Sequence, residues 1–368
     1  MNLSNIRYAN AFALKIPLIK PMLMAGTHIT HAETLIVRIE THSGNVGWGE
    51  NTAAPSHGGQ TLEAMLESFD HGIKDSLIGN DSKNLSAISA LLAHKFPKGS
   101  GAIAAIDIAL YDLMGKELDI PAYSLMGGKR RDSIPPLWLI GTKSVEMDIA
   151  EAQKCQKLGY QFFKLKLGVK SVREDIESAL GIRNALGSSI QLCADANMGY
   201  STEDAVAFLE GTREAKIAFL EQPLAKNNLD GLKKICGLHI APIGLDESIT
   251  SIQDMIESKQ YGVSGVSLKT LKLGGISGVL RSATVCDAFG LQINLAGKIA
   301  ETSVASAAVL QLSAALTEVN WGISPSHLYL AEDIVDQPIE PNQGVYSIPN
   351  RPGLGIEVNE SKLKRFQA

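Results

Sequence analysis

The sequence lacks the charge pattern of a protein that binds polyanions. Its 34 lysines and arginines stand against 39 aspartates and glutamates, which gives a formal net charge of −5 at pH 7. A mildly acidic chain offers little attraction to nucleic acid or to an anionic membrane surface. We therefore expect neither of these partners.

Long apolar runs are also missing. The N-terminal segment MNLSNIRYANAFALKIPLIKPMLMAG contains no apolar stretch long enough for a secretory signal. No later stretch is both long enough and free enough of charge to span a bilayer. We expect a cytoplasmic location for these reasons.

Cysteine is scarce, and the sequence contains no C-x-x-C pair. None of the cysteines has a neighbouring histidine of the kind that accompanies a metal site. We interpret the four of them as reduced and mostly packed thiols in a reducing compartment. They are Cys155, Cys193, Cys236 and Cys286.

What is present is the composition of an ordinary globular protein, with 45% hydrophobic and 20% charged residues. A chain of 368 residues can hold one large α/β barrel with an accessory domain, or two to three smaller domains. Residues 1–125 combine strands with helices, which favours an α+β domain. The expected strands, 34–41 and 46–50, form a hairpin, and the expected helices cover 60–77, 84–92 and 101–118.

From about residue 134 onward, short apolar strands alternate with helices. An open doubly wound sheet shows the same alternation, but eight strands favour a (β/α)8 barrel of the TIM type. We expect the barrel over residues 126–337, and a Pro- and Gly-rich tail, 338–368, that returns to an N-terminal capping domain. The expected strands are 136–141, 162–168, 190–197, 217–223, 241–247, 265–270, 291–297 and 319–321. The expected helices include 145–158, 172–186, 202–214, 252–258 and 276–289.

Three consecutive barrel strands end in a carboxylate, at Asp195, Glu221 and Asp246. The C-terminal ends of the strands carry the chemistry in barrels of this kind. Clustered carboxylates repel one another and favour a cation between them, and hard oxygen ligands suit Mg²⁺, with Mn²⁺ as a second candidate. One such residue alone could equally cap the next helix, but three in consecutive units indicate a metal site.

Lysines stand on the strands that flank the carboxylate strands. Lys164 and Lys166 share one face of the strand before Asp195, and Lys269 ends the strand after Asp246. Desolvation or a neighbouring cation makes an ammonium release its proton more easily, as a lysine base requires near neutral pH. Taken alone, Lys164 and Lys166 could form a solvated strand face. Together with Lys269 and a metal, they indicate proton transfer next to a carboxylate through an enediolate.

The motifs FKLKLG, CADANMGY, FLEQPL, GLDESI and SLKTLKLGG, in this order and spacing, resemble the muconate lactonizing enzyme subgroup of the enolase superfamily. GWGE, IDIALYDLMGK and GLGIEV extend the resemblance to the mandelate racemase/muconate lactonizing enzyme family over nearly the whole chain. The resemblance implies that the three strand-end carboxylates bind Mg²⁺. It also implies a homo-oligomer, either a dimer or an octamer.

The resemblance further implies roles for the residues around the metal. Lys166 is the expected base on one face of the substrate, and Lys269 the acid or base on the other. Lys164 is expected to lower the pKa of Lys166 and to contact the substrate carboxylate. Asn197 and Glu247 match positions that orient the metal ligands or the Lys269 ammonium.

In this subgroup, specificity comes from two loops of the capping domain and from the last barrel loops. The corresponding segments here are 21–31, 52–59, 296–301 and 321–326. Glu301 matches the glutamate after the seventh strand of muconate cycloisomerases, and His28 and His57 are candidate substrate-binding residues in the capping loops. We interpret the HITH histidines as lid residues rather than as a metal pair. Trp321 is expected to pack, with a place in the pocket wall as the alternative.

Two departures from the family pattern bear on the substrate. The segment NWGISPSH lacks the Asp-x-Asp pair with which dipeptide epimerases of this subgroup hold an α-ammonium group. Lys298 stands where muconate cycloisomerases usually carry Gly-Thr-Met-Leu-Glu, and a cation there could pair with a second substrate carboxylate. We therefore favour a dicarboxylate or an N-acyl amino acid as the substrate. A solvated Lys298 on the following helix is the alternative.

We expect a Mg²⁺-dependent isomerase of a small carboxylate, either a muconate-like cycloisomerase or a racemase/epimerase. A lyase, such as a dehydratase or an o-succinylbenzoate synthase, would use the same residues. A catalytically silent barrel that binds metal is the alternative from a different class. A nicotinamide-binding protein is disfavoured because no G-x-G-x-x-G joins a first strand to a helix.

Overall fold

The computed structural model describes residues 2–24, 27–141 and 144–368. Its N-terminal part contains a three-stranded antiparallel sheet in the order β1-β2-β3. The strands are β1 (Ile6–Met24), β2 (Thr27–Thr41) and β3 (Val46–Thr52). The predicted hairpin is confirmed as the end of β2 and the beginning of β3.

Strand β1 was not predicted from the sequence. Pro17 and Pro21 interrupt its pattern, and its register with β2 shifts between Pro17 and Met22. A proline cannot donate a ladder hydrogen bond, so a run that contains two of them does not resemble a strand. The extended conformation of β1 is determined by its pairing with β2, which continues on both sides of the irregularity, rather than by its local sequence pattern.

The N-terminal helices pack against this sheet. They are α1 (Leu62–Ser68), α2 (Lys74–Leu77), α3 (Leu85–Lys95) and α4 (Ser100–Leu118), with a π-helical turn at Phe69–Ile73 and 3-10 turns at Pro55–His57 and Ala122–Met126. The single helix expected over 60–77 is broken at Gly72, where φ is 117°. Helix α4 approaches β3 so closely that a Cβ on Gly49 would lie 1.9 Å from the carbonyl oxygen of Ala105.

Eight parallel strands form the second sheet, in the order β12-β11-β10-β9-β8-β7-β6-β5. They are β5 (Leu137–Ile140), β6 (Phe162–Lys166), β7 (Gln191–Asp195), β8 (Leu220–Glu221), β9 (Ile243–Leu245), β10 (Gly265–Leu268), β11 (Gln292–Ala296) and β12 (Ile323–Ser324). A bridge between Pro136 and Ile323 joins the first strand to the last, which closes the sheet into a barrel.

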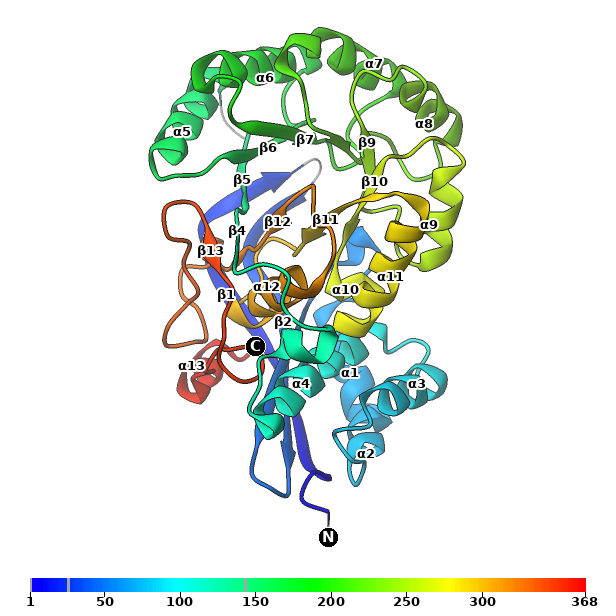
Figure 1. Cartoon of the computed structure of the whole chain (residues 1–368), viewed down its shortest axis with the longest axis vertical. Coiled ribbons are helices and arrows are strands. Elements are labelled where there is room, and N and C mark those ends of the chain that lie inside the picture. Colours follow the sequence, from blue (N-terminus) through cyan, green and yellow to red (C-terminus); the bar gives the residue numbers. More distant parts are fainter. Residues whose placement is uncertain (1, 25–26, 142–143) are drawn as a thin grey trace.

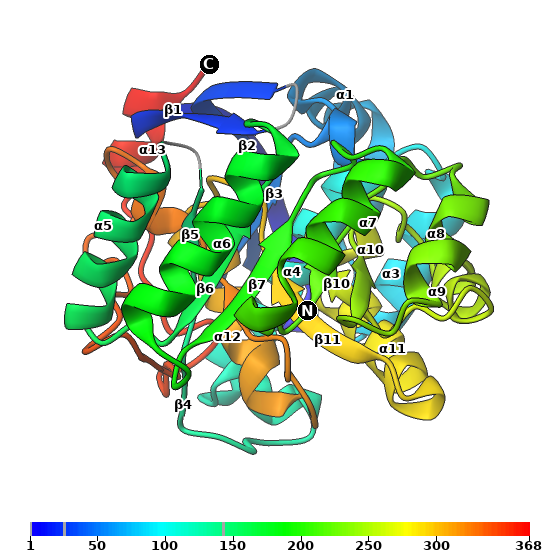
Figure 2. The ribbon, with the colours of Figure 1, turned by 90° about the horizontal axis from the view of Figure 1, so that it is seen from above.

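Helices surround the barrel, and Figure 1 shows α5 to α9 as an arc outside the parallel strands, with the blue N-terminal strands on the open side of that arc. Figure 2 shows α5, α6 and α7 side by side across β6 and β7. The barrel helices are α5 (Val145–Lys157), α6 (Val172–Leu186), α7 (Thr202–Gly211), α8 (Leu229–Cys236), α9 (Ile252–Lys259), α10 (Thr270–Leu273), α11 (Gly275–Phe289) and α12 (Ser303–Ala315), with 3-10 turns at Arg213–Ala215 and His327–Tyr329.

The predicted fold class is therefore confirmed, but one strand was placed wrongly. The eighth strand is Ile323–Ser324 rather than 319–321. Gly322, with φ of 77°, turns the chain, so pairing with β11 begins at Ile323, opposite Leu295. The valine and tryptophan that suggested a strand lie before this turn.

The C-terminal tail returns to the N-terminal part. Strand β13 (Tyr346–Ser347) pairs with β4 (Ser133–Ile134) in a small antiparallel sheet. Helix α13 (Glu360–Phe366) leads to Ala368, whose amide donates to the carbonyl oxygen of Ala13 in β1 at 2.9 Å. The contact between Ala368 and Ala13 agrees with the return that we expected for the Pro- and Gly-rich tail.

Apolar side chains fill the barrel at the beginning of its strands. Trp321 stacks on Phe219 with ring centroids 4.1 Å apart, and Phe162 meets Phe219 edge-on. Leu137 and Cys193 complete this cluster, and all four cysteines are buried in the reduced form, as predicted. This cluster closes the barrel interior at the N-terminal ends of the strands, so the interior can open to solvent at their C-terminal ends.

In the described part of the chain, no helix has the length and apolar character needed to cross a membrane.

Candidate active site

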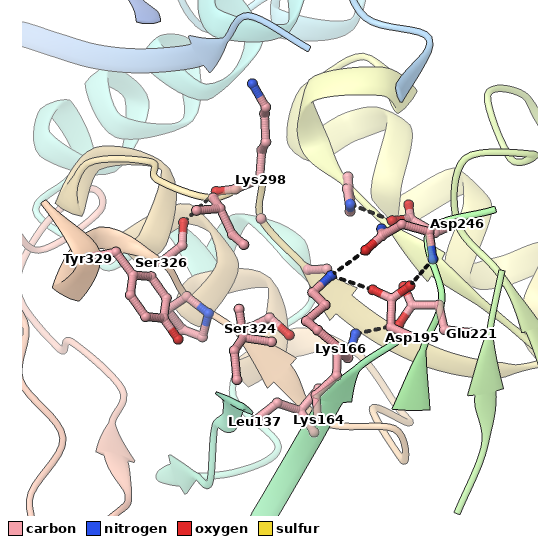
Figure 3. A pocket seen from close by; sticks show the side chains of 17 residues that line it. Leu137, Lys164, Lys166, Asp195, Glu221, Asp246, Lys298, Ser324, Ser326 and Tyr329 are labelled. Carbon is pink, nitrogen blue, oxygen red and sulfur yellow. Dashed lines mark hydrogen bonds and ion pairs between the residues drawn. The ribbon is translucent and has the colours of Figure 1, made fainter. Parts of the chain in front are cut away.

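A pocket opens at the C-terminal ends of the barrel strands, and Figure 3 shows the charged side chains that converge on it. The strand-end lysines and carboxylates predicted from the sequence all line this pocket. They are Lys164, Lys166, Asp195, Glu221, Asp246 and Lys269, joined by Asn197 and Lys298. Their side chains lie on the inner face of the barrel, whereas Phe163, Leu165 and Leu167 pack in the core outside it.

Lys164 is buried deep in the pocket. Its ammonium donates to the carboxylate of Glu221 and, at 3.4 Å, to Oδ1 of Asn294. The hydroxyl of Ser267 donates to the other oxygen of Glu221 at 2.6 Å. Burial disfavours the charged form of Lys164, but attraction by Glu221 and Asp195 outweighs burial and raises its pKa.

Lys166 lies two residues further along β6, closer to the mouth of the pocket. Its Nζ donates to Oδ2 of Asp195 at 2.6 Å and to Oδ1 of Asn197 at 2.9 Å. The amide of Asn197 donates in turn to Oε1 of Glu247 at 2.9 Å. Asn197 has φ of 43°, and this left-handed conformation follows the end of β7 and directs its side chain to Lys166. The structure thus connects Lys166 to both residues predicted to orient the site.

Asp246 lies between two lysines. Lys269 Nζ donates to its Oδ2 at 2.5 Å, and Lys272 Nζ donates to its Oδ1 at 2.7 Å and to its carbonyl oxygen. Burial opposes the charge on Lys269, but the attraction of Asp246, Glu247 and Glu221 raises its pKa. For Lys272, burial is the larger effect and lowers the pKa.

Opposite effects act on the acids of the site. Burial raises the pKa of Asp195, but the attraction of Lys166 and Lys164 outweighs burial and leaves the pKa lowered. Burial and repulsion by Asp246 and Asp195 raise the pKa of Glu247 to about 7. The buried carboxylates therefore repel one another, and the lysine ammonium groups supply the compensating positive charge.

The three strand-end carboxylates have the donor chemistry of a Mg²⁺ site. Each is a hard oxygen ligand, and they come from the adjacent strands β7 and β8 and from the residue after β9. Within residues 2–24, 27–141 and 144–368, however, no group of three His, Cys, Asp or Glu side chains converges as a ready metal centre. Their oxygens contact lysine ammonium groups instead. The three carboxylates therefore have the chemistry to bind a metal cation if it takes the place of those ammonium groups.

Glu301 is buried behind the pocket wall. A Cβ on Gly297 would lie 2.1 Å from its Oε2, which shows how closely the loop after β11 covers this carboxyl. No hydrogen-bond partner for Oε2 is present in the described part of the chain. Burial and repulsion by Glu50 raise the pKa of Glu301 to about 8.

Lys298 is half-buried and extends away from the carboxylates, as Figure 3 shows. Its ammonium donates to the carbonyl oxygen of Ala53, in the segment after β3. Burial lowers its pKa, while attraction by Glu301 opposes that effect. Lys298 is thus not solvated on the following helix, which was the alternative placement.

The other predicted substrate-binding residues are distributed differently. His28 lies in β2 and lines a second hollow beside Lys298. The backbone of His57 belongs to the 3-10 turn Pro55–His57, but its side chain lies outside the described part of the structure. Trp321 does not line the pocket, because its ring packs at the opposite end of the barrel against Gly244 and Gly265. The packing interpretation of Trp321 is the one that the structure supports.

Several polar residues of the site were not identified from the sequence. Lys272 has a visible signal, because it lies three residues after Lys269 and one helical turn brings it back to the same face. Gln222 accepts from the backbone amides of Asp246 and Ser248, at 3.0 and 3.1 Å, and so fixes the end of β9. Asn294 and Ser267 carry no sequence signal, since their roles depend on pairings between strands.

The fold and the site together define a barrel enzyme in which buried lysines face a cluster of carboxylates at the C-terminal ends of the strands. Comparison with known proteins gives the family. Residues 9–127 match the mandelate racemase / muconate lactonizing enzyme N-terminal domain, and residues 148–362 match the enolase C-terminal domain-like family. The chain belongs to the muconate lactonizing enzyme subgroup of the enolase superfamily and is an isomerase of that superfamily.

Curated relatives of known activity share almost the full length of the chain. A chloromuconate cycloisomerase of Cupriavidus pinatubonensis is 30% identical over 358 residues, which is 95% of each chain. An L-Ala-D/L-Glu epimerase of Bacillus subtilis is 30% identical over 346 residues, 93% of this chain and 94% of the epimerase. Relatives of similar identity thus catalyse different isomerisations.

Solved structures show the same range. A muconate lactonizing enzyme of Pseudomonas fluorescens, in complex with muconolactone, superposes with a TM-score of 0.94 at 28% identity and covers 100% of both chains. An N-succinyl Arg/Lys racemase of Bacillus cereus superposes with a TM-score of 0.93 at 26% identity and covers 99% of this chain and 98% of the racemase.

Proposed function

We propose that this protein is a Mg²⁺-dependent racemase or epimerase that moves a proton at the α-carbon of a small carboxylate. The observation that carries the proposal is the position of the two lysines. Strands β6 and β10 lie four strands apart in the eight-stranded order, which is halfway round a closed barrel. Lys166, on β6, and Lys269, directly after β10, therefore reach the pocket from opposite sides.

Opposed lysines suit proton transfer at one carbon. One neutral lysine removes the α-proton on its side, and the other, as an ammonium, donates a proton to the opposite face of the resulting enediolate. The deep Lys164 would contact the substrate carboxylate from below. Asn197 would orient Lys166, and Glu247 would act through Asn197.

Asp195, Glu221 and Asp246 would hold the metal ion. Bound there, Mg²⁺ would supply positive charge that favours the substrate carboxylate and its enediolate. The strand-end carboxylates already attract ammonium groups at 2.5 and 2.6 Å, which supports their affinity for a cation. Mn²⁺ is the alternative metal, because it prefers similar ligands.

Deuterium incorporation at the α-carbon tests the proposal. Carboxylates incubated with the enzyme and Mg²⁺ in D₂O are followed by proton NMR, with N-acyl amino acids, diacids, dipeptides and betaines in the panel. Lys166→Ala should abolish exchange for one antipode, and Lys269→Ala for the other, because each lysine serves one face. Exchange of both antipodes by Lys166→Ala would contradict the role of this lysine as a base.

Calorimetry of Mg²⁺ binding separates the metal ligands from the bases. Asp195→Asn should weaken Mg²⁺ binding, whereas Lys166→Ala should retain it. Unchanged Mg²⁺ affinity in Asp195→Asn would remove Asp195 from the metal ligands.

Cycloisomerisation is the second candidate, because the family includes the chloromuconate cycloisomerase that matches 95% of this chain. It needs proton transfer at one face only, so a single lysine variant would abolish it. A muconate substrate that forms a lactone without α-exchange of N-acyl amino acids would favour this candidate. A lyase would use the same residues and would be recognised by an eliminated product.

Three further proposals concern the protein as a whole. We infer a cytoplasmic location and a homo-oligomer, a dimer or an octamer. We also infer that residues 1–125, together with 338–368, act as one capping domain over the barrel of residues 126–337. The Lys298 contact with Ala53 supports a cap that borders the active site.

A further inference from the structure

A network of polar side chains lies outside the barrel wall, behind the end of strand β6. Its members come from α5, from α6 and from the loops that follow β6 and β7, and Figure 2 shows these two helices side by side across the strands. They lie outside the active-site pocket, and all but one are buried. The members of this outer network are Asp148, Lys170, Asp175, Ser178 and Tyr200.

Asp175, in the first turn of α6, holds the loop that directly follows Lys166. Its Oδ2 accepts from the amide of Gly168 at 3.0 Å and from the hydroxyl of Tyr200 at 2.7 Å. Gly168 has φ of 74°, so the chain turns two residues after Lys166, in a conformation that favours glycine. The buried carboxylate of Asp175 therefore fixes the turn at the end of the lysine strand.

Asp148, in α5, holds the neighbouring strand end in a similar way. Its Oδ1 accepts from the amide of Gly141, directly after β5, at 3.2 Å. A Cβ on Gly141 would lie 2.6 Å from the carbonyl oxygen of Lys166 and 2.8 Å from its amide nitrogen, so Gly141 packs on the backbone of this lysine. On the other side of β6, the amide of Leu167 donates to the carbonyl oxygen of Asp195 at 2.9 Å. The backbone around Lys166 is therefore held on both sides.

Lys170 joins the two helices of the outer network. Its ammonium donates to Oδ2 of Asp148 at 2.7 Å and to the hydroxyl of Ser178 at 2.8 Å. Only 11% of the Lys170 side chain and 1% of the Asp148 side chain are exposed, so removal of either would leave a poorly hydrated charge. The loop after Lys166 is thus tied to α5 through Lys170, and to α6 through Lys170 and Asp175.

We propose that Asp175 is a positioning residue for Lys166, and that it acts through the loop of residues 167–171 without contacting the substrate. The inference rests on the proposed function, in which Lys166 serves one face of the substrate and Lys269 the other. Lys269 follows β10, four strands away from β6, and the outer network does not support it. A displacement of about 1 Å at a reacting group can lower a rate about a hundredfold. Loss of Asp175 should therefore affect one face of the substrate.

The rate of α-exchange in D₂O, measured separately for the two antipodes of a carboxylate that the wild type exchanges, tests the inference. Asp175→Ala should lower kcat by about tenfold to a hundredfold for the antipode whose exchange Lys166→Ala abolishes. KM, and the exchange of the other antipode, should change little. A purely structural role would reduce the amount of folded enzyme and so lower the rates of both antipodes by the same factor.

Three further variants make the result specific. Tyr200→Phe keeps the ring against Phe208 and removes only a hydroxyl that donates to Asp175, so it should give a smaller loss for the same antipode. Asp175→Asn keeps an oxygen that can accept from Gly168 and should recover part of the rate. Asp112→Ala removes a buried carboxylate of α4 that likewise accepts from two backbone amides, at 2.9 and 2.8 Å. This control should affect both antipodes equally.

The inference and the proposed function fail in different ways. An equal loss for both antipodes in Asp175→Ala, or no loss, would overturn the inference and leave the proposed function intact. If Asp175→Ala fails to fold, Tyr200→Phe decides, and the absence of a one-sided loss in that variant would overturn the inference. Absence of exchange by the wild type with every carboxylate in the panel would overturn the proposed function and this inference with it.

Discussion

At the scale of single residues, the strand-end lysines of the site form buried ion pairs with its three strand-end carboxylates. Lys164 pairs with Glu221, Lys166 with Asp195, and Lys269 with Asp246. Pairs of this kind are costly to break, because removal of one member leaves an uncompensated buried charge. The lysines therefore contribute to the arrangement of the carboxylates, in addition to the proton transfer that we propose for Lys166 and Lys269.

Lys272 is the clearest case of a residue that positions another. Its buried side chain fixes Oδ1 of Asp246, while Lys269 contacts Oδ2. Lys272→Met should lower the free energy of unfolding by about 3 kcal/mol and weaken Mg²⁺ binding, because Asp246 loses its orientation. Denaturant unfolding and calorimetry measure the two effects.

The matched control is Lys116→Met, which breaks the pair between Lys116 and the buried Asp112 in α4, at 2.7 Å. This variant should also lose stability but should keep Mg²⁺ affinity. Equal metal affinity in Lys272→Met and wild type would contradict a positioning role for Lys272.

Glu301 links stability to pH. Its pKa is raised from 4.5 to about 8, so between these values the folded state holds a proton that the unfolded state releases. The free energy of unfolding should therefore fall as pH rises through this window, by at most about 1.4 kcal/mol per pH unit, and level off above it. Glu301→Gln cannot titrate and should lack this component.

Urea unfolding of the wild type and of Glu301→Gln between pH 5 and pH 9 measures the difference between their free energies of unfolding. The stability of wild type relative to Glu301→Gln should decrease with pH. A constant difference between the two curves would mean that Glu301 is already ionised at pH 5.

At the scale of elements, sequence patterns predicted what local chemistry determines. Helix α6 was expected at 172–186 and observed at Val172–Leu186, because Ser171 and Glu174 form a capping box at its start and Gly187 follows its end. Strand β8 was expected at 217–223 but covers only Leu220–Glu221, since Gln222 adopts φ of 34°. Its side chain holds the amides after β9, a contact between strands that no local pattern reveals.

At the scale of the whole molecule, Glu50 joins the N-terminal part to the barrel. This buried carboxylate of β3 accepts hydrogen bonds from the amides of Thr302 and Ala305 and from the Thr302 hydroxyl, all at the start of α12. The hydroxyl of Thr34 in β2 also donates to it, at 2.9 Å. Glu50 therefore fixes the helix that directly follows Lys298 and Glu301.

Glu50→Ala should lower the free energy of unfolding by about 3 kcal/mol or more, because it leaves buried amides of α12 without a partner. It should also slow α-exchange, since the loop that carries Lys298 loses its support. Glu50→Gln, which can still accept, should be milder, and Glu63→Ala, at an exposed position of α1, should change neither quantity. Wild-type stability and exchange in Glu50→Ala would contradict this role.

The sequence by itself determined the barrel, the family and the strand-end lysines and carboxylates, because strand periodicity and motif spacing are local properties. Only the tertiary structure placed Trp321 at the closed end of the barrel, brought Lys272 to Asp246 and brought Glu50 to α12. It also placed Lys298 between the active-site pocket and the second hollow, with its ammonium donating to the carbonyl oxygen of Ala53. These contacts join segments far apart in the chain, and which of them form depends on the closure of the barrel and the docking of the N-terminal strands against it.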